Sequence, residues 1–178
     1  TRAAHRTPEI DEVDLAGLAL ELAAWGTPAS RLAFMTPPPA KAMRAAADLL
    51  RALGAFDADD AITDTGRAML RMPVHPRLAR MVVAEPTSLG CALAAMVDER
   101  DVFRGRLDDV PADLALRLAV LAGTADERAA DRRAVSRVRE RARDIARRAG
   151  IEFDPVAIGV HVERTGRALL AGYPDRLA

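Results

Sequence analysis

Two prolines close together, between two stretches of helix-forming residues, constrain the fold of this chain more than any other feature. The segment reads ITDTGRAMLRMPVHPRLARM over residues 62–81. Thr63 can cap a first helix through its hydroxyl. Pro73 and Pro76 end that helix, because proline lacks a backbone N–H and disfavours helical geometry in the residue before it. Pro76 can also begin a second helix, so the sequence predicts two helices joined at a corner.

Helical periodicity continues on both sides of this corner. Half of the residues are hydrophobic but only 3% are aromatic, which suits packed helices better than a sheet sandwich. Thr36, before three prolines, is expected to cap a helix, whereas residues 55–62 read as two very short strands around an acidic turn. The predicted helices span residues 11–25, 37–53, 63–72, 76–85, 88–99, 111–122, 127–149 and 155–171. The expected fold is mainly α, with a winged-helix pattern and a small β-hairpin followed by a helical bundle.

Three single residues invite a functional interpretation, and a structural one is favoured for each. Trp25 lies in line with the leucines of its helix, which favours a packed core aromatic over a base-stacking platform. Cys91, the one cysteine, lies in an apolar run and reads as a small buried hydrophobe rather than a reactive thiol. His75, between two prolines, favours packing or capping. With His5 and His161 far away in sequence, no metal site is expected.

The arginine-rich stretch 127–149 is the feature with the clearest binding chemistry. Lys+Arg and Asp+Glu both total 26 in the chain, yet this stretch holds nine arginines against four acidic residues. One helical face carries Arg133, Arg137, Arg141 and Arg148. An apolar seam at alternating three- and four-residue spacing comprises Val135, Val138, Ala142, Ile145 and Ala149. Phosphate binding by the guanidinium forks and a merely solvated face remain equally open interpretations.

A second basic row lies on the predicted helix over 37–53. Lys41, Arg44 and Arg51 follow one another there, but Asp48 interrupts them. The adjacent acidic residues Asp59 and Asp60 read as solvated turn carboxylates rather than an acid–base pair. This row is therefore the weaker of the two candidate nucleic-acid contacts.

Nucleotide-hydrolysis motifs are absent from the sequence. It contains neither a GxxxxGK[ST] loop nor an Asp-Glu-Ala-His run, so we expect no ATP hydrolysis by this chain alone and no cofactor within it. No run approaches the ~20 apolar residues of a membrane span, and no signal peptide is visible, so the expected location is the cytoplasm. Because the chain begins without methionine, we expect it to be a fragment of a longer polypeptide.

Several short motifs, in order and spread over nearly the whole chain, resemble the region that follows the motor in DEAH-box ATP-dependent RNA helicases of the bacterial HrpB type. The corner itself, with its T-x-x-G-R and P-x-x-P-R-L-A runs, is the most specific of them. The others are PEI (8–10), DLAGL (14–18), LAAWG (22–26), PPP (37–39), LRALGA (50–55), LGCAL (89–93), ERD (99–101) and YPDR (173–176).

This resemblance implies an organisation and a role. Residues 1–12 would end a RecA-like domain, 13–72 form a degenerate winged helix, 73–172 a ratchet-like helical domain, and 173–178 begin the next domain. The chain would dock on the RecA-like motor, which uses ATP and magnesium, and would guide single-stranded RNA or DNA. Two other functions remain open: a winged-helix DNA-binding regulator, and a helical scaffold for an acidic protein partner.

Overall fold

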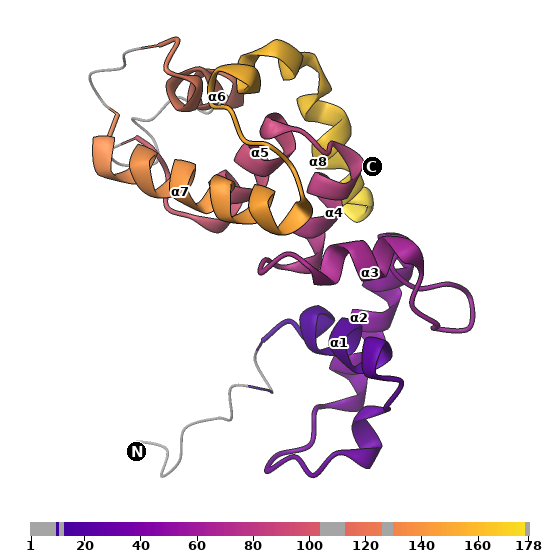
Figure 1. The fold of residues 1–178 in the computed structure, drawn as a ribbon. Helices are drawn as coiled ribbons and strands as arrows, with labels where there is room; N and C mark the ends of the chain where they lie inside the picture. Colours follow the sequence, from indigo (N-terminus) through magenta and orange to yellow (C-terminus); the bar gives the residue numbers. More distant parts are fainter. Residues whose placement is uncertain (1–9, 11–12, 104–112, 126–129, 177–178) are drawn as a thin grey trace, which may run out of the picture. The chain divides into compact units, whose positions relative to one another are not determined.

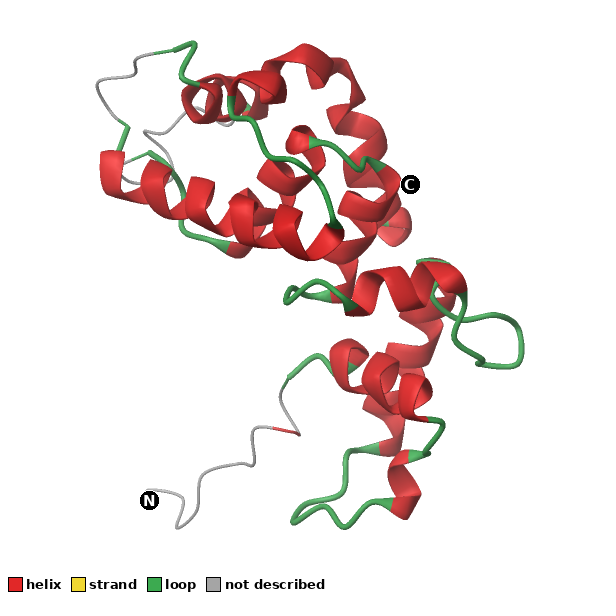
Figure 2. Ribbon diagram, in the orientation of Figure 1, coloured by secondary structure: helices red, strands yellow, loops and turns green. Residues whose placement is uncertain are grey.

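The computed structural model describes residues 10, 13–103, 113–125 and 130–176 (Figure 1). The chain divides into two compact units, Thr1–Leu70 and Arg71–Ala178. Figure 2 shows helices and loops, and the described residues contain no strand, so the predicted mainly α class is confirmed. The expectations for 1–9 and 11–12, for the loop over 104–110 and for a helix start at Pro111 lie outside the described residues.

The first unit is built from three α-helices and a short 3-10 turn. They are α1 (Ala16–Trp25), η2 (Ala29–Arg31), α2 (Ala40–Ala52) and α3 (Asp64–Leu70). α1 packs against both α2 and α3. Most buried side chains of this unit are aliphatic or methionine, in keeping with the shortage of aromatic residues, and they include Leu15, Leu20, Leu22, Leu50, Leu53 and Met69.

Thr63 and Gly66 fix the start of α3. The Thr63 hydroxyl accepts a hydrogen bond from the Gly66 backbone N–H at 3.1 Å and donates one to the Gly54 carbonyl at 2.7 Å. The predicted cap is therefore confirmed. A Cβ atom at position 66 would lie 2.5 Å from the Ala55 carbonyl oxygen, which explains why glycine stands three residues after the threonine.

The predicted β-hairpin over 55–62 is wrong. Phe56 and Ile62 form one isolated antiparallel bridge, with no strand on either side. The Asp57 carboxylate accepts from the Asp59 and Ala61 backbone N–H groups, both at 2.9 Å, and so closes a tight turn immediately after that bridge. The turn takes up the residues between Phe56 and Ile62, so one bridged pair forms there instead of two paired strands.

Trp25 is exposed, so the prediction of a packed core aromatic is wrong. Its side chain is 70% exposed, whereas Ala16 and Ala19 on the same helix are buried. Trp25 lies nine residues after Ala16, about 2.5 helical turns, and therefore on the opposite side of α1. Alanines and leucines together form the buried face of α1, so the spacing of the leucines alone predicts the wrong orientation for Trp25.

Two helix starts in the first unit also differ from the sequence prediction. α2 begins at Ala40 with Pro39 at its N-cap and without a side-chain cap, so the predicted cap at Thr36 is wrong. Successive prolines keep the residues before them extended, which delays the helix. α1 begins at Ala16 rather than near residue 11, and the Asp14 carboxylate accepts from the Ala16 backbone N–H at 2.7 Å.

The second unit is a helical bundle around α5. Its elements are α4 (Pro76–Ala84), α5 (Ser88–Asp98), α6 (Leu114–Ala122), α7 (Arg132–Ala149), η4 (Val156–Arg164), α8 (Thr165–Gly172) and η5 (Pro174–Arg176). α5 packs against α4, α6, α7, α8 and η4, and its residues from Ser88 to Ala95 are all buried. No helix among the described residues is both long and apolar enough to cross a membrane.

Two corner residues, His75 and Pro76, act as the sequence predicts, although α3 already ends at Leu70 rather than at Met72. Pro76 is in the first turn of α4, and the Nδ1 atom of His75, the N-cap residue, accepts from the Arg77 backbone N–H at 3.2 Å. The capping role of His75 is thus confirmed. By contrast, the helix predicted over 155–171 is a 3-10 segment followed by α8, and His161 within the 3-10 segment departs from helical geometry. Glycines and valines in this stretch have low helix propensity, which explains the break.

Candidate nucleic-acid interface

Helix α7 carries four of the six candidate residues, and local signals fix both of its ends. The Asp131 carboxylate accepts from the backbone N–H groups of Arg133 and Ala134, and Gly150 ends the helix with a positive φ of 72°. The predicted seam faces the core: Val135, Val138, Ala142 and Ile145 are buried, and Ala149 is half-buried. α7 packs on the central helix α5 through this face, so its outer face has a fixed orientation in the second unit.

Arg133, Arg137 and Arg148 lie on the outer face of α7, and we call these three residues the outer row. At about 100° per residue they fall within an arc of roughly 60°. All three side chains are exposed. Within the described part of the chain, none of the three guanidinium groups makes an ion pair. The outer row is thus a set of unneutralised charges on a well-anchored helix.

Arg141 belongs to the same predicted face but is held by neighbours. Its guanidinium pairs with the Asp98 carboxylate at 2.7 Å and lies 3.7 Å from that of Asp144. It also donates to the backbone carbonyl of Pro73 in the corner before α4. Arg141 therefore fastens α7 to the corner and to the end of α5, and its charge is largely compensated.

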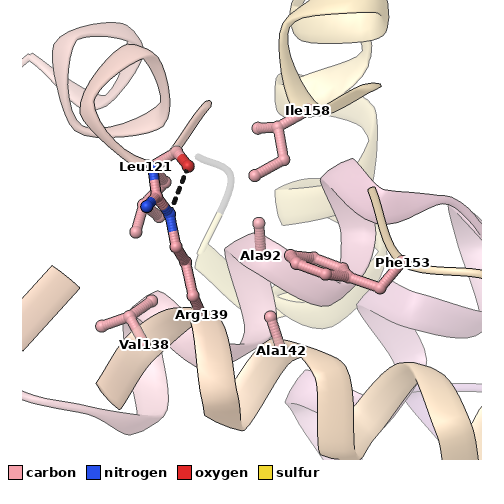
Figure 3. A pocket seen from close by; sticks show the side chains of 7 residues that line it. All are labelled: Ala92, Leu121, Val138, Arg139, Ala142, Phe153 and Ile158. Carbon is pink, nitrogen blue, oxygen red and sulfur yellow. Dashed lines mark hydrogen bonds between the residues drawn. The ribbon is translucent and has the colours of Figure 1, made fainter. Parts of the chain in front are cut away.

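Arg139 has turned inward, where it completes the neighbouring helix α6. Its Nε donates to the Leu121 carbonyl at 2.8 Å, and a terminal nitrogen donates to the Val120 carbonyl at 3.3 Å. Figure 3 shows this side chain extending from α7 to Leu121, at a crevice whose other lining residues are Ala92, Val138, Ala142, Phe153 and Ile158. A cation that donates to the unpaired carbonyls at a helix C-terminus stabilises the helix. Arg139 therefore stabilises the end of α6.

The other edge of the outer face of α7 carries three further exposed arginines, Arg132, Arg143 and Arg147. Arg143 lies over the Phe153 ring, with 5.9 Å between the guanidinium carbon and the ring centre. Arg147 pairs with Asp144, one turn away. Arg132, at the start of the helix, is exposed. These three residues supply a charge-matched comparison for the outer row.

The candidate residues of α2 stand in a different electrostatic setting. Lys41 and Arg44 are exposed. Farther along α2, the Arg51 guanidinium contacts the Asp60 carboxylate at 2.7 Å and that of Asp48 at 2.5 Å, and these hydrogen bonds raise the pKa of Arg51. The turn that follows α2, where a DNA-binding winged helix would carry basic residues, is acidic instead.

Other polar groups in the described residues serve the fold. Cys91 is fully buried, which confirms the prediction of a small buried hydrophobe, and this burial raises the pKa of its thiol to about 12. Burial acts to raise the pKa of Asp101, but hydrogen bonds from Arg117 and the Phe103 backbone outweigh it, and the pKa lies below its usual value. Arg117 also lies 5.3 Å from the Phe103 ring centre. Among the described residues, no group of three or more His, Cys, Asp or Glu is placed to hold a metal ion.

A cavity in the first unit does not have the composition of a catalytic site. It has a volume of about 420 Å³ and lies between α1 and α2, with Leu22, Met43 and Phe56 among its mostly apolar lining residues. Its one ionisable lining residue, Asp60, is the partner of Arg51. General acid–base chemistry needs a titratable group that is free to exchange a proton with a substrate, and Asp60 is engaged.

Comparison with known proteins shows which proteins this chain is similar to. The model of a winged-helix, helicase-associated domain (HA2) matches residues 46–74. The human protein described as probable ATP-dependent RNA helicase DHX35 is 36% identical over 103 residues, which cover 54% of this chain and 14% of that protein. The chain thus matches the C-terminal accessory region of DEAH-box helicases.

Among these proteins, the structural similarity to HrpB extends over nearly the whole chain. ATP-dependent RNA helicase HrpB of Escherichia coli (strain K12) is 34% identical over 96 residues, which cover 53% of this chain and 12% of that protein. A crystal structure of E. coli DExH-box NTPase HrpB aligns with 98% of this chain and 19% of its own length, with a TM-score of 0.70 and 25% identity. The resemblance to HrpB-type helicases is therefore confirmed, and the chain spans a small part of the curated relatives it matches.

Proposed function

We propose that this chain acts as the accessory region of an HrpB-like ATP-dependent RNA helicase, in which it docks on the motor and guides single-stranded nucleic acid. Residues 13–72 would form the winged-helix domain and residues 73–172 a ratchet-like domain. The RecA-like motor domains of the same polypeptide would bind ATP and magnesium. The chain itself would contribute no catalytic group.

The outer row of α7 is the observation that carries this proposal. Exposed arginines without ion-pair partners in the described residues retain their full charge for a ligand. Their helix buries Val138, Ala142 and Ile145 on its opposite side, so the three charges are presented on a rigid support. Guanidinium groups match the geometry of phosphate oxygens and contact the backbone without reading base sequence. This is what a helicase needs, because it must move along strands of any sequence.

The role follows from rigidity and charge together. When a motor pulls a strand, a fixed wall with phosphate-directed side chains keeps the strand on its path and resists its lateral escape. Arg141 supports such a wall indirectly, because it joins α7 to Asp98 and to the Pro73 carbonyl. Arg133, Arg137 and Arg148 would make the contacts, with Arg141 adding mainly to the rigidity. Lys41 and Arg44 would make at most a minor contribution, because the nearby turn is acidic.

The test is the binding of a fluorescein-labelled single-stranded RNA to the 178-residue chain, followed by fluorescence anisotropy at low ionic strength. We expect weak binding that Arg133→Ala/Arg137→Ala/Arg148→Ala lowers by about tenfold or more, as the loss of several phosphate contacts predicts. The matched control is Arg132→Ala/Arg143→Ala/Arg147→Ala, which removes the same charge from the same helix. Equal losses in the two triple variants would show a general charge effect and would contradict an RNA path along the outer row.

The alternative of a DNA-binding winged-helix regulator has weaker support. A recognition helix must offer free basic side chains to duplex DNA, whereas Arg51 of α2 is paired with Asp48 and Asp60. Competition with duplex DNA in the same titration separates the two functions. Preference for duplex over single strands, together with sensitivity to Lys41→Ala/Arg44→Ala, would favour the regulator.

A further inference from the structure

The two proline-containing segments at the ends of the second unit lie against each other. Residues 73–78 form the corner and the first residues of α4, and residues 173–176 carry the YPDR run after α8. Neither segment contributes to the outer row. The side chain of Arg77, which is 15% exposed, contacts both Tyr173 and Asp175 of the second segment.

Arg77 fastens the C-terminal run in three ways. Its two terminal nitrogens donate to the two carboxylate oxygens of Asp175, at 2.6 and 2.8 Å. One of them also donates to the Gly172 carbonyl at 3.1 Å. The guanidinium carbon lies 5.1 Å from the centre of the Tyr173 ring. A forked pair combined with stacking on an aromatic ring requires arginine, because lysine has neither the fork nor the planar group.

Gly172 brings the two helices close enough for this contact. A Cβ atom at position 172 would lie 2.6 Å from Met81 Cγ and 2.7 Å from the Arg77 carbonyl oxygen, both atoms of α4. No side chain fits there without displacing backbone. The close approach of α8 to α4 therefore depends on glycine at the point where α8 ends.

The other ends of the same two helices are also joined. Glu85, at the C-cap of α4, is buried, and its carboxylate lies 3.5 Å from the Arg164 guanidinium at the N-cap of α8. The Thr87 hydroxyl donates to the same carboxylate at 3.0 Å. α4 and α8 thus run antiparallel with a charged contact at each end. At one end α4 supplies the arginine, Arg77, and at the other end it supplies the carboxylate, Glu85. A slide of α8 by one turn would break both.

We propose that residues 172–176 form a strap that locks α8 in register on α4, with Arg77 as the residue that fastens it. With the strap closed, α4, α8 and the 3-10 segment η4 behave as one body. With the strap open, α8 is held by its apolar contacts and by the longer Glu85–Arg164 contact, and it opens locally while the rest of the bundle stays folded. Arg77 is a positioning residue in this device, and the proposal does not depend on nucleic-acid binding.

The test is hydrogen–deuterium exchange of the 178-residue chain, read by mass spectrometry over peptides from α8, α7 and α1. In Arg77→Ala and in Asp175→Asn, we expect exchange in α8 to become about fivefold faster, with α1 unchanged. The matched control is Arg176→Ala, which alters a neighbouring exposed residue whose guanidinium lies 3.9 Å from the Asp175 carboxylate, and it should leave exchange in α8 unchanged.

Three further outcomes decide the proposal. The double variant Arg77→Ala/Asp175→Asn should exchange no faster in α8 than Arg77→Ala alone, because both changes remove the same contact. Arg77→Lys keeps the charge but not the fork, and it should give most of the effect of Arg77→Ala. If Arg77→Ala unfolds the whole unit, Asp175→Asn on the half-exposed strap remains decisive. Unchanged exchange in α8 for Asp175→Asn, or equal effects of Arg176→Ala, would overturn the strap.

Discussion

Helices α2 and α7 both carry basic residues at helical spacing, yet the fold gives these residues different neighbours. On α2, Arg51 is surrounded by Asp48 and Asp60 at hydrogen-bond distance. On α7, the partnered arginines Arg139 and Arg141 face other helices, and the outer row is left with its charge. The comparison teaches that a basic helix becomes a candidate binding surface only where tertiary contacts leave its charges uncompensated.

The largest effect should come from the apolar side of α7, since the outer row depends on its anchor. Ile145 is fully buried, and Ile145→Ala should lower the free energy of unfolding by about 2–4 kcal/mol through lost burial and the resulting cavity. Urea denaturation followed by circular dichroism measures this. A loss below about 1 kcal/mol would mean that α7 is loosely packed and that its outer face is not a fixed surface.

A smaller effect should separate Arg141 from the outer row. Arg141→Ala breaks the contacts with Asp98 and the Pro73 carbonyl, and for a side chain 25% exposed it should cost about 1 kcal/mol of unfolding free energy. Arg137→Ala, which alters an exposed side chain on the same face, should cost close to nothing in the same denaturation experiment. Equal costs for the two variants would remove the distinction between fastening and outer arginines.

The Arg77–Asp175 contact should make the stability of the chain depend on pH. Hydrogen bonds from Arg77 lower the pKa of Asp175 to about 2, against about 3.9 in an unfolded chain. A lowered folded-state pKa adds stability above the unfolded value and loses it as pH falls toward 2. The native chain should therefore be more stable than Asp175→Asn at pH 5, and the difference should shrink between pH 4 and pH 2. Thermal melts across this range test the sign, and a difference that grows on acidification would contradict the Arg77–Asp175 contact.

The smallest expected effect is a change in RNA affinity when the acidic partners of Arg51 on α2 are removed. Asp48→Asn/Asp60→Asn frees Arg51 from its partners and should raise single-stranded RNA affinity by about twofold at low salt. Glu21→Gln/Asp64→Asn, which removes the same charge from elsewhere in the first unit, is the matched control. If both variants raise the affinity equally, net charge rather than local pairing explains the difference between the helices.

Signals that act over one helical turn allowed much of this fold to be predicted from sequence. Gly26 and Gly150 end α1 and α7 with positive φ, Thr63 caps α3 and Pro76 begins α4, and each depends on residues near it in sequence. The apolar seam of α7 follows from the same periodicity.

Features that depend on distant partners could not be predicted in the same way. Arg141 meets Asp98 and Arg77 meets Asp175 across 43 and 98 residues, and no local pattern indicates which acid will lie beside which arginine. Trp25 was misplaced because leucine spacing ignored the buried alanines of α1. The prediction of a hairpin is wrong because the turn at Asp57 leaves only one bridged residue pair, Phe56 and Ile62. The proposed domain boundaries and the six candidate contact residues remain predictions.

The salt dependence of RNA binding tests the central claim most directly. For single strands, the logarithm of the binding constant falls with the logarithm of salt concentration by about 0.7 per phosphate contact. If Arg133, Arg137 and Arg148 each hold one phosphate, Arg133→Ala/Arg137→Ala/Arg148→Ala should reduce the magnitude of this slope by about 2. The Arg132→Ala/Arg143→Ala/Arg147→Ala variant should then keep nearly the native slope. A native slope in the outer-row variant would contradict the account, because RNA would then bind without phosphate contacts on this face of α7.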